Sequence, residues 1–290
     1  MSAPLLFRPS PDAVYGFPHA KRVAHVDSPF QRIEVWDTPQ LGRLFTLDGR
    51  PMASTGDEFI YHECMVHPAA LAHPSPQAAL VLGGGDGGAA RQLLRHAGIE
   101  RIVVAELDAE VVRLTREHLP EVHGGAFDNP RVELVIGDAA HYVEAAAPAQ
   151  FDLVVFDLTP PDSPAAGLYT RAFYQQLKRI MSPTAAVSVH LGSPYFHAER
   201  IARLLGDLRA AFGIVRTMST FVPLYGSLWM MATASDTLDP AALTAATLAE
   251  RLAARQIDGL KHYDAAMHAG LFSASRAVRD KLSQFLKPAS

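Results

Sequence analysis

The chain has 290 residues, of which 49% are hydrophobic and 19% charged, with a formal net charge of −4. This length allows one large domain, or a main domain with a small accessory one, and the charge gives no reason to expect nucleic acid or an anionic membrane as partner. No apolar run approaches the ~20 residues of a membrane-spanning helix. Cys64 is the single cysteine and the chain start does not resemble a signal peptide, so a cytoplasmic location is expected.

The N-terminal part of the chain differs in pattern from the rest. Residues 1–18 are rich in proline and are predicted to be irregular. Residues 22–53 alternate between polar and apolar side chains, with turn residues between the runs, which predicts short antiparallel strands. We therefore expect a small β domain over residues 1–56, followed by a helix over residues 57–71.

From residue 79 onward, strand-like and helix-like segments alternate, which is typical of a largely parallel sheet with helices on both faces. Residues 57–290 are predicted to form one α/β domain. The expected strands lie near residues 79–83, 101–106, 131–136, 151–156, 185–190, 214–222 and 228–234. The expected helices lie near residues 88–97, 109–118, 139–146, 170–180, 196–212, 240–255 and 275–286.

A glycine-rich turn follows the first of these strands. Gly83, Gly85 and Gly88 have the G-x-G-x-x-G spacing of a Rossmann-type turn, in which the backbone can approach a nucleotide closely. Glu106 ends the next strand, where an acid can bind a ribose diol. Asp86 places a negative charge inside the turn, which disfavours a pyrophosphate and favours a cationic nucleoside such as a sulfonium, or its amine-bearing tail.

Acidic residues stand at the carboxyl ends of four successive expected strands, where open parallel sheets bind ligands: Asp86, Glu106, Asp138 and Asp157. A single acid at such a place is often a helix N-cap, and Asp138 fits that role equally well. Four in succession favour a ligand site. Asp157, which precedes a proline-rich loop, is the best candidate for a base or for an acid that holds an amine, although a plain turn would also explain it.

Two further groups of residues have alternative interpretations. His62 and His67 are five residues apart, about 140° around a helix, so they do not fit the zinc motif of metalloproteases. No metal site is predicted, and His62 is retained as a residue of the ligand site. Tyr225 and Trp229 lie near the junction of the last two strands, where they could form a pocket wall or pack within a hairpin.

Taken together, these residues resemble the polyamine aminopropyltransferases, the spermidine synthase family. The resemblance extends over nearly the whole chain. Its most specific parts are Asp57-Glu-Phe-Ile-Tyr-His-Glu63 and Gly83-Gly-Gly-Asp-Gly-Gly88. Shorter matches include the segments at residues 28–35, 47–49, 106–108, 128–132, 136–138, 167–170, 192–194 and 263–268.

The resemblance implies a methyltransferase-like Rossmann domain with a small N-terminal antiparallel β domain, and a homodimer or homotetramer. It implies decarboxylated S-adenosylmethionine as the donor co-substrate, a small-molecule amine as the acceptor, 5′-methylthioadenosine as a product and no further cofactor. By position, Asp157 would accept the proton of the attacking amine. The implied donor-binding residues are Gln31, Tyr61, His62, Gly83, Gly85, Asp86, Glu106 and Asp138, and the acceptor-binding residues are Asp162, His190, Tyr225 and Trp229.

The match departs from the family pattern on the acceptor side. The family's loop usually reads Asp-Ser-Ser-Asp-Pro, whereas this chain reads Asp157-Leu-Thr-Pro160-Pro, so the second acid is a proline. Asp162 could replace that acid or point into solvent. Two glutamines usual in the family are Met52 and His190 here. The acceptor therefore stays open among putrescine, another diamine, a longer polyamine and agmatine.

Two other functions stay open from the sequence. One is a methyltransferase that uses intact S-adenosylmethionine on the same fold, against which Asp86 argues because it would repel the carboxylate of that molecule. The other is a catalytically silent protein that binds a nucleoside or a polyamine. The altered loop supports this second alternative, whereas the presence of both Asp86 and Asp157 disfavours it.

Overall fold

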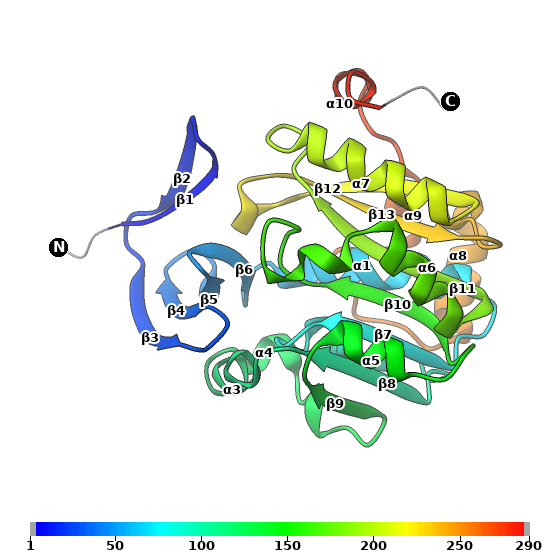
Figure 1. The fold of residues 1–290 in the computed structure, drawn as a ribbon, viewed down its shortest axis with the longest axis horizontal. Coiled ribbons are helices and arrows are strands. Elements are labelled where there is room, and N and C mark those ends of the chain that lie inside the picture. Colours follow the sequence, from blue (N-terminus) through cyan, green and yellow to red (C-terminus); the bar gives the residue numbers. More distant parts are fainter. Residues whose placement is uncertain (1–3, 287–290) are drawn as a thin grey trace.

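The computed structural model describes residues 4–286, and within them the chain forms three β-sheets (Figure 1). The central sheet has seven strands in the order β12-β13-β11-β10-β7-β8-β9. The five strands from β11 to β9 pair in parallel, whereas β13 and β12 are antiparallel additions at one edge. The strands are β7 (Ala78–Gly83), β8 (Arg101–Glu106), β9 (Val132–Ile136), β10 (Phe151–Asp157), β11 (Met181–Gly192), β12 (Ile214–Val222) and β13 (Ser227–Ser235).

Helices cover both faces of this sheet because successive strand residues point to opposite sides. In β7, Leu80 and Leu82 belong to one hydrophobic core and Ala79 and Val81 to the other. The first core is closed by α5 (Ala139–Ala145), α6 (Arg171–Ile180), α7 (Ala198–Ala211) and α10 (Arg276–Ser283). The second is closed by α1 (Glu58–Ala72), α2 (Gly88–Leu94), α8 (Ala245–Ala254) and α9 (Ala265–Leu271).

The N-terminal strands form two smaller sheets beside the central one (Figure 1). A four-stranded antiparallel sheet packs its apolar face, including Ile33 and Phe45, against α3 (Ala109–His118) and α4 (Pro120–His123). Its strands are β3 (Lys21–Asp27), β4 (Arg32–Thr38), β5 (Gly42–Leu47) and β6 (Arg50–Ser54). The other sheet is a hairpin of β1 (Leu5–Ser10) and β2 (Ala13–Phe17).

The predicted α/β class, the antiparallel N-terminal strands and the helical tail are confirmed. The prediction of irregular structure for residues 1–18 is wrong over residues 5–17, and residues 1–3 lie outside the described part. Leu5 and Phe7 alternate with exposed neighbours and are buried against Leu44 and Leu224, which stabilises the hairpin despite its prolines. The division into domains 1–56 and 57–290 stays a prediction; β6 ends at Ser54 and α1 begins at Glu58.

The chain order reverses beside β7, since β8 lies on one side of it and β10 on the other. Such a reversal leaves a crevice at the carboxyl ends of the strands. Here the N-terminal strands close that crevice from the outside, so residues of both parts line one pocket. Among the described residues, no helix has the length and apolar character needed to cross a membrane.

Candidate active site

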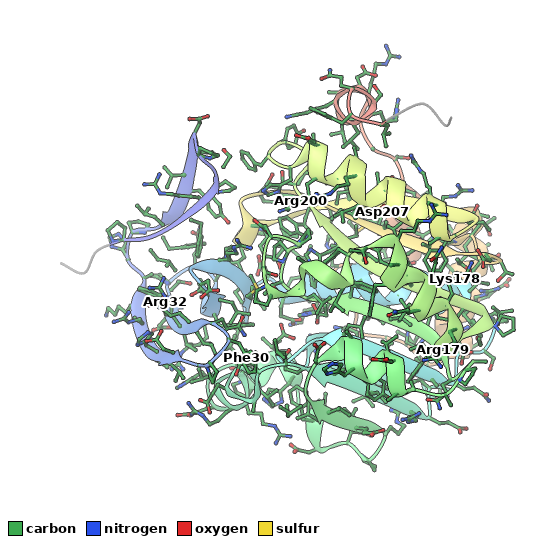
Figure 2. All side chains as sticks on the ribbon, viewed as in Figure 1. Phe30, Arg32, Lys178, Arg179, Arg200 and Asp207 are labelled. Carbon is green, nitrogen blue, oxygen red and sulfur yellow. The ribbon has the colours of Figure 1, made fainter. Side chains whose placement is uncertain are left out.

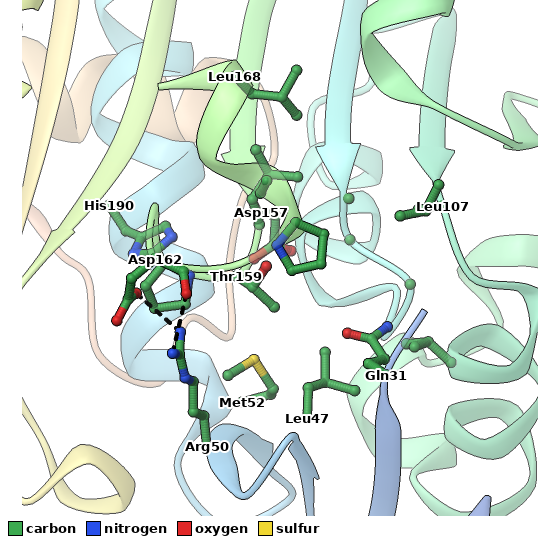
Figure 3. Close-up of a pocket in the computed structure, with 18 of the residues that line it drawn as sticks. Gln31, Leu47, Arg50, Met52, Leu107, Asp157, Thr159, Asp162, Leu168 and His190 are labelled. Atoms are coloured by element: carbon green, nitrogen blue, oxygen red, sulfur yellow. Dashed lines mark hydrogen bonds and ion pairs between the residues drawn. The ribbon is translucent and has the colours of Figure 1, made fainter. Parts of the chain in front are cut away.

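A pocket of about 640 Å³ lies at the carboxyl ends of the parallel strands, and every site residue predicted from the sequence lines it. In Figure 3, Gln31 and Leu107 lie on one side of Asp157. Arg50 and Asp162 lie on the other. The pocket thus has two ends, with Asp157 between them. We call the end at Gln31 and Glu106 the donor end, and the end at Arg50 and Asp162 the acceptor end, after the roles that the sequence resemblance predicts for Gln31, Glu106 and Asp162.

The glycines of the turn after β7 are required by neighbouring protein atoms. Gly83 has a φ of +76°, and a Cβ there would lie 2.3 Å from the carbonyl oxygen of Asp157. A Cβ on Gly88 would lie 2.2 Å from the His62 ring, and one on Gly85 would lie 2.9 Å from the Glu106 side chain. The glycines therefore let β10, His62 and Glu106 approach the turn closely.

Two buried carboxylates at the donor end are held by backbone N–H groups. Glu106 accepts hydrogen bonds from the N–H of Gly85 at 3.1 Å and of Asp108 at 2.9 Å. Asp86 accepts from the N–H of Gly88 at 2.8 Å. Burial raises the pKa of Glu106 to about 7 and that of Asp86 to about 6. Both groups therefore ionise close to neutral pH, where an approaching cation would favour the charged form.

His62 lies among three acids. Its Nδ1 is 2.7 Å from Glu58, and its Nε2 is 3.6 Å from Asp86 and 3.7 Å from Asp157. Burial disfavours the imidazolium, but the three carboxylates outweigh it and hold the pKa of His62 well above its usual value. Glu58 in turn is paired with Arg91 at 2.6 Å. His62 is therefore a positive charge fixed on the floor of the pocket.

Asp157 ends β10, and its Oδ2 is the atom that lies 3.7 Å from His62 Nε2. Its Oδ2 is buried and has no hydrogen-bond partner among the described residues. His62, Asp86 and Asp157 each offer one side-chain atom that could bind a cation, and these three atoms lie within 4.8 Å of one another. A cation placed between the two carboxylates would satisfy this oxygen, and an ammonium group can do so by hydrogen bonding as well as by charge.

Asp138 and Gln31, two further donor-end residues, lie nearer the surface. The Asp138 side chain accepts from the N–H of Ala140 at 2.7 Å, so it is the N-cap of α5 while it also lines the pocket. The Gln31 amide donates to Asp108 at 3.1 Å. The cap and the ligand-site interpretations of Asp138 are therefore compatible, because one carboxylate oxygen makes the cap.

Aromatic side chains form a wall beside Asp157. The Tyr225 and Trp229 rings are 4.3 Å apart, Trp229 stacks on His190 at 6.1 Å, and Tyr61 meets Tyr225 edge-on at 6.2 Å. Burial lowers the pKa of His190 to about 4, so this ring is neutral. Its Nε2 lies 2.7 Å from the Tyr169 hydroxyl, which donates to the carbonyl of Thr159.

Asp162 lines the pocket, but its carboxylate is already paired. The Arg50 guanidinium donates to its Oδ1 at 2.9 Å and to its carbonyl at 3.2 Å (Figure 3), and Arg200 lies 3.5 Å from the same Oδ1. These arginines hold the pKa of Asp162 below its usual value although partial burial opposes them. Asp162 is therefore not a free acid in the place of the one lost at Pro160.

Sequence reasoning missed both of these arginines. Arg50 directly follows Leu47-Asp48-Gly49, a segment that the resemblance already includes, so its place in β6 offered a signal. Arg200 lies in the first turn of α7, and no sequence signal indicated that it would line the pocket. His67, by contrast, lies away from the pocket, 3.0 Å from His96 and 3.2 Å from Gln92, and burial lowers its pKa to about 3.

Comparisons with known proteins show which family the chain is similar to. The family model described as "Spermine/spermidine synthase domain" matches residues 58–243. The chain is 44% identical to a polyamine aminopropyltransferase of Nitrosomonas europaea over 95% of this chain and 84% of the relative. It is 38% identical to "Polyamine aminopropyltransferase 2" of Hyperthermus butylicus over 88% of this chain and 84% of the relative.

Solved structures are similar over almost the whole length. A spermidine synthase in complex with the transition-state analogue AdoDATO superposes with a TM-score of 0.85 at 28% identity, covering 94% of this chain and 91% of that one. The spermidine synthase of Thermotoga maritima gives a TM-score of 0.84 at 29% identity, covering 94% and 90%. The chain belongs to the spermine/spermidine synthase family and is an aminopropyltransferase.

Proposed function

We propose that the pocket binds decarboxylated S-adenosylmethionine at its donor end and a primary amine beyond Asp157, and that Asp157 accepts the proton of the attacking amine. The observation that carries this proposal is the cluster of Asp157, Asp86 and His62 at the junction of the two pocket ends, in which the Oδ2 of Asp157 accepts no hydrogen bond from residues 4–286. The methyltransferase and binding-protein alternatives are favoured by none of these observations.

The donor would be held by charge and by close backbone approach. Glu106 would accept hydrogen bonds from the ribose diol, with Gln31 beside it and Asp138 near the adenine. Gly83 and Gly85 would let the nucleoside lie against the backbone. Asp86, with Tyr61 and His62 around it, would bind the aminopropyl ammonium.

Asp86 also provides a reason to reject intact S-adenosylmethionine. Intact S-adenosylmethionine carries a carboxylate that the decarboxylated donor lacks. Binding would bring this carboxylate toward the buried carboxylate of Asp86, which would repel it. His62 opposes this by attracting the same carboxylate. The local count still favours the decarboxylated donor, because Glu58 is already paired with Arg91 and one imidazolium then faces the two carboxylates of Asp86 and Asp157.

The transfer itself is a displacement at carbon. An alkylamine has a pKa near 10.4 and arrives protonated, so it must lose a proton before it can attack. Asp157 would bind the ammonium, take one proton and leave the nitrogen lone pair facing the methylene beside the sulfonium. The new C–N bond forms as the C–S bond breaks, and the sulfur keeps the electron pair and becomes the neutral thioether of 5′-methylthioadenosine. Alignment and charge placement are then the main contributions of the protein.

The aromatic wall would guide the aliphatic part of the acceptor amine. Tyr225, Trp229 and His190 present flat apolar surfaces on which methylene groups and an ammonium can lie.

We expect no further cofactor. We also expect a homodimer or homotetramer that acts in the cytoplasm; light scattering on the purified chain would test the assembly.

The test is release of 5′-methylthioadenosine from decarboxylated S-adenosylmethionine with a panel of amines. The panel holds putrescine, cadaverine, 1,3-diaminopropane, agmatine and spermidine, with intact S-adenosylmethionine as the control donor. We expect release that depends on both the amine and the decarboxylated donor. Methyl transfer from the intact donor, or donor binding without release for any amine, would contradict the proposal.

A further inference from the structure

One wall of the pocket is the loop that follows Asp157, residues 158–168. Pro160 and Pro161 have no backbone N–H, and none of the turn and loop backbone hydrogen bonds among the described residues involves residues 158–162. Such bonds resume where the N–H of Ala166 donates to the carbonyl of Ser163 at 3.0 Å. The position of residues 158–162 therefore depends on side-chain contacts.

The carbonyl groups at the start of the loop are held from two directions. The carbonyl of Asp157 accepts from the N–H of Gly84 at 2.9 Å, which ties it to the turn after β7. The carbonyl of Thr159 accepts from the hydroxyl of Tyr169 at 3.1 Å. Tyr169 is only 4% exposed, and its ring packs 5.8 Å from that of Phe156 in the core. The hydroxyl therefore ties the loop to a side chain that the core already fixes.

His190 fixes the direction of the Tyr169 hydroxyl. Its Nε2 lies 2.7 Å from the hydroxyl oxygen, and burial lowers the pKa of His190 to about 4, so the ring is neutral and carries one proton. A tyrosine hydroxyl has one hydrogen, which Tyr169 donates to Thr159, so its oxygen accepts the N–H of His190. His190 lies in β11, which pairs in parallel with β10. Two consecutive hydrogen bonds thus connect His190 to Thr159, next to Asp157 (Figure 3).

A second contact holds the loop from the outside. Arg50 and Arg200 of α7 (Figure 2) pair with Asp162 at 2.9 Å and 3.5 Å. The Asp162 side chain is 59% exposed, so solvent and salt screen this contact. Tyr169 and His190 are buried and neutral, and their hydrogen bonds hold the loop beside Asp157 without depending on charge.

We propose that Tyr169 and His190 are positioning residues of aminopropyl transfer: they fix the Thr159 carbonyl and with it the pocket wall that the attacking amine meets beside Asp157. His190 then acts through Tyr169, while its ring face remains part of the aromatic wall. An ordered wall leaves the amine fewer orientations, which favours attack in line with the C–S bond. The inference rests on the proposed function and assigns two residues to positioning in that same pocket.

The first experiment removes the Tyr169 hydroxyl alone. Tyr169→Phe leaves the Thr159 carbonyl without its donor, and loss of one such hydrogen bond is expected to lower kcat/KM for the best amine about fivefold. Donor affinity, measured by calorimetry, should change less than about twofold, because the donor-end acids are held by other bonds. Hydrogen exchange followed by mass spectrometry should become faster in residues 158–168 and stay unchanged elsewhere.

Tyr174→Phe is the matched control. The Tyr174 ring also packs 5.8 Å from Phe156, but its buried hydroxyl has no hydrogen-bond partner among the described residues. This variant should exchange and react like the unaltered protein. Loop exchange in Tyr169→Phe that matches the control, or faster exchange spread over the whole core, would overturn the inference and leave the proposed function intact. No release of 5′-methylthioadenosine from the unaltered protein with any amine would overturn the proposed function, and the positioning role with it.

The second experiment changes His190. His190→Gln keeps an N–H donor and should stay within about twofold of the unaltered kcat/KM, whereas His190→Phe keeps a flat ring without the donor and should lose about threefold. Because both residues act through one chain of hydrogen bonds, His190→Phe should add little to the loss in Tyr169→Phe. A loss in His190→Phe that is equally large with and without the Tyr169 hydroxyl would mean that His190 acts on the amine directly, and would overturn the inference.

Discussion

The donor and acceptor ends of the pocket are built in different ways. At the donor end, Glu106, Asp86 and Asp138 each accept a hydrogen bond from a backbone N–H within a strand-to-helix turn. At the acceptor end, Arg50 of β6 and Arg200 of α7 meet Asp162 of the loop after β10 through their side chains. The first end is acidic and fixed by the topology of the sheet, whereas the second is basic and assembled from distant segments.

This difference separates what the fold determines from what can vary. A carboxylate held by the turn after a parallel strand keeps its place as long as the strand order is kept. A charge pair between loop, helix and N-terminal sheet can change with single substitutions. We therefore expect the donor end to serve the activity that the family shares, and the acceptor end to determine which amine this chain uses. Substitutions at each end should have separable effects on donor and acceptor kinetics.

The largest effect is expected where the two ends meet. Asp157→Asn removes the proton acceptor with little change in shape, and loss of a positioned base lowers rates by about 10²–10⁴. Single-turnover release of 5′-methylthioadenosine measures this loss. Donor affinity, measured by calorimetry, should change much less. Asp280→Asn, an exposed acid on α10, is the control. An unchanged residual rate in Asp157→Asn would remove Asp157 from the mechanism.

Asp86→Asn should affect the donor end alone. Loss of the carboxylate that faces the aminopropyl ammonium is expected to weaken binding of decarboxylated S-adenosylmethionine about 10- to 100-fold. Binding of intact S-adenosylmethionine should weaken less or improve, because its carboxylate is no longer repelled. Calorimetric titration with both nucleosides gives the ratio. An unchanged ratio would show that Asp86 does not select the donor.

The acids of the donor end and of the junction could be predicted from the sequence because each follows a recognisable apolar strand. Two observations were enough to place Glu106, Asp138 and Asp157 at the site. Strands and helices alternate along the chain, and the carboxyl ends of parallel strands lie at the same edge of the sheet. The family resemblance then predicted their roles. The antiparallel orientation of β12 and β13 could not be predicted from periodicity, because an apolar strand has the same sequence pattern in parallel and antiparallel pairs.

The acceptor end could not be predicted in this way. Arg200 is one of several arginines on an amphipathic helix, and only the packed structure turns it toward Gly192 and Asp162. Arg50 contacts Asp162 across 112 positions of sequence, which depends on how the N-terminal sheet lies on the crevice. The hairpin at residues 5–17 was missed for a related reason, because its stability comes from burial against Leu44 and Leu224.

A smaller effect is expected from restoring an acid at the acceptor end. Pro160→Asp places a carboxylate at the position where the family's loop usually carries one, and it should raise kcat/KM for putrescine about three- to tenfold, as a partly exposed ion pair allows. Pro160→Ala separates the charge from the loss of a stiff residue. Equal changes in Pro160→Asp and Pro160→Ala would show that loop stiffness, and not charge, controls the choice of acceptor.

The smallest expected effect on rate comes from Glu58, which lies behind the pocket and would act only through His62. Glu58→Gln removes one of the carboxylates that raise the pKa of His62, so that pKa falls. In the unaltered protein the raised pKa keeps His62 protonated through neutral pH, and in the variant its titration should move toward neutral pH. Turnover at pH 7 should fall about threefold, because the charge that orients Asp86 and Asp157 weakens.

Nuclear magnetic resonance of the His62 ring measures this shift directly. His62→Gln assigns the signal by its disappearance, and Glu250→Gln, an exposed acid on α8, is the control. A His62 signal that titrates alike with and without Glu58 would mean that Asp86 and Asp157 alone hold the proton on the ring. In that case the donor end would depend only on carboxylates that line the pocket, and the Arg91–Glu58 pair would serve only to pack α2 against α1.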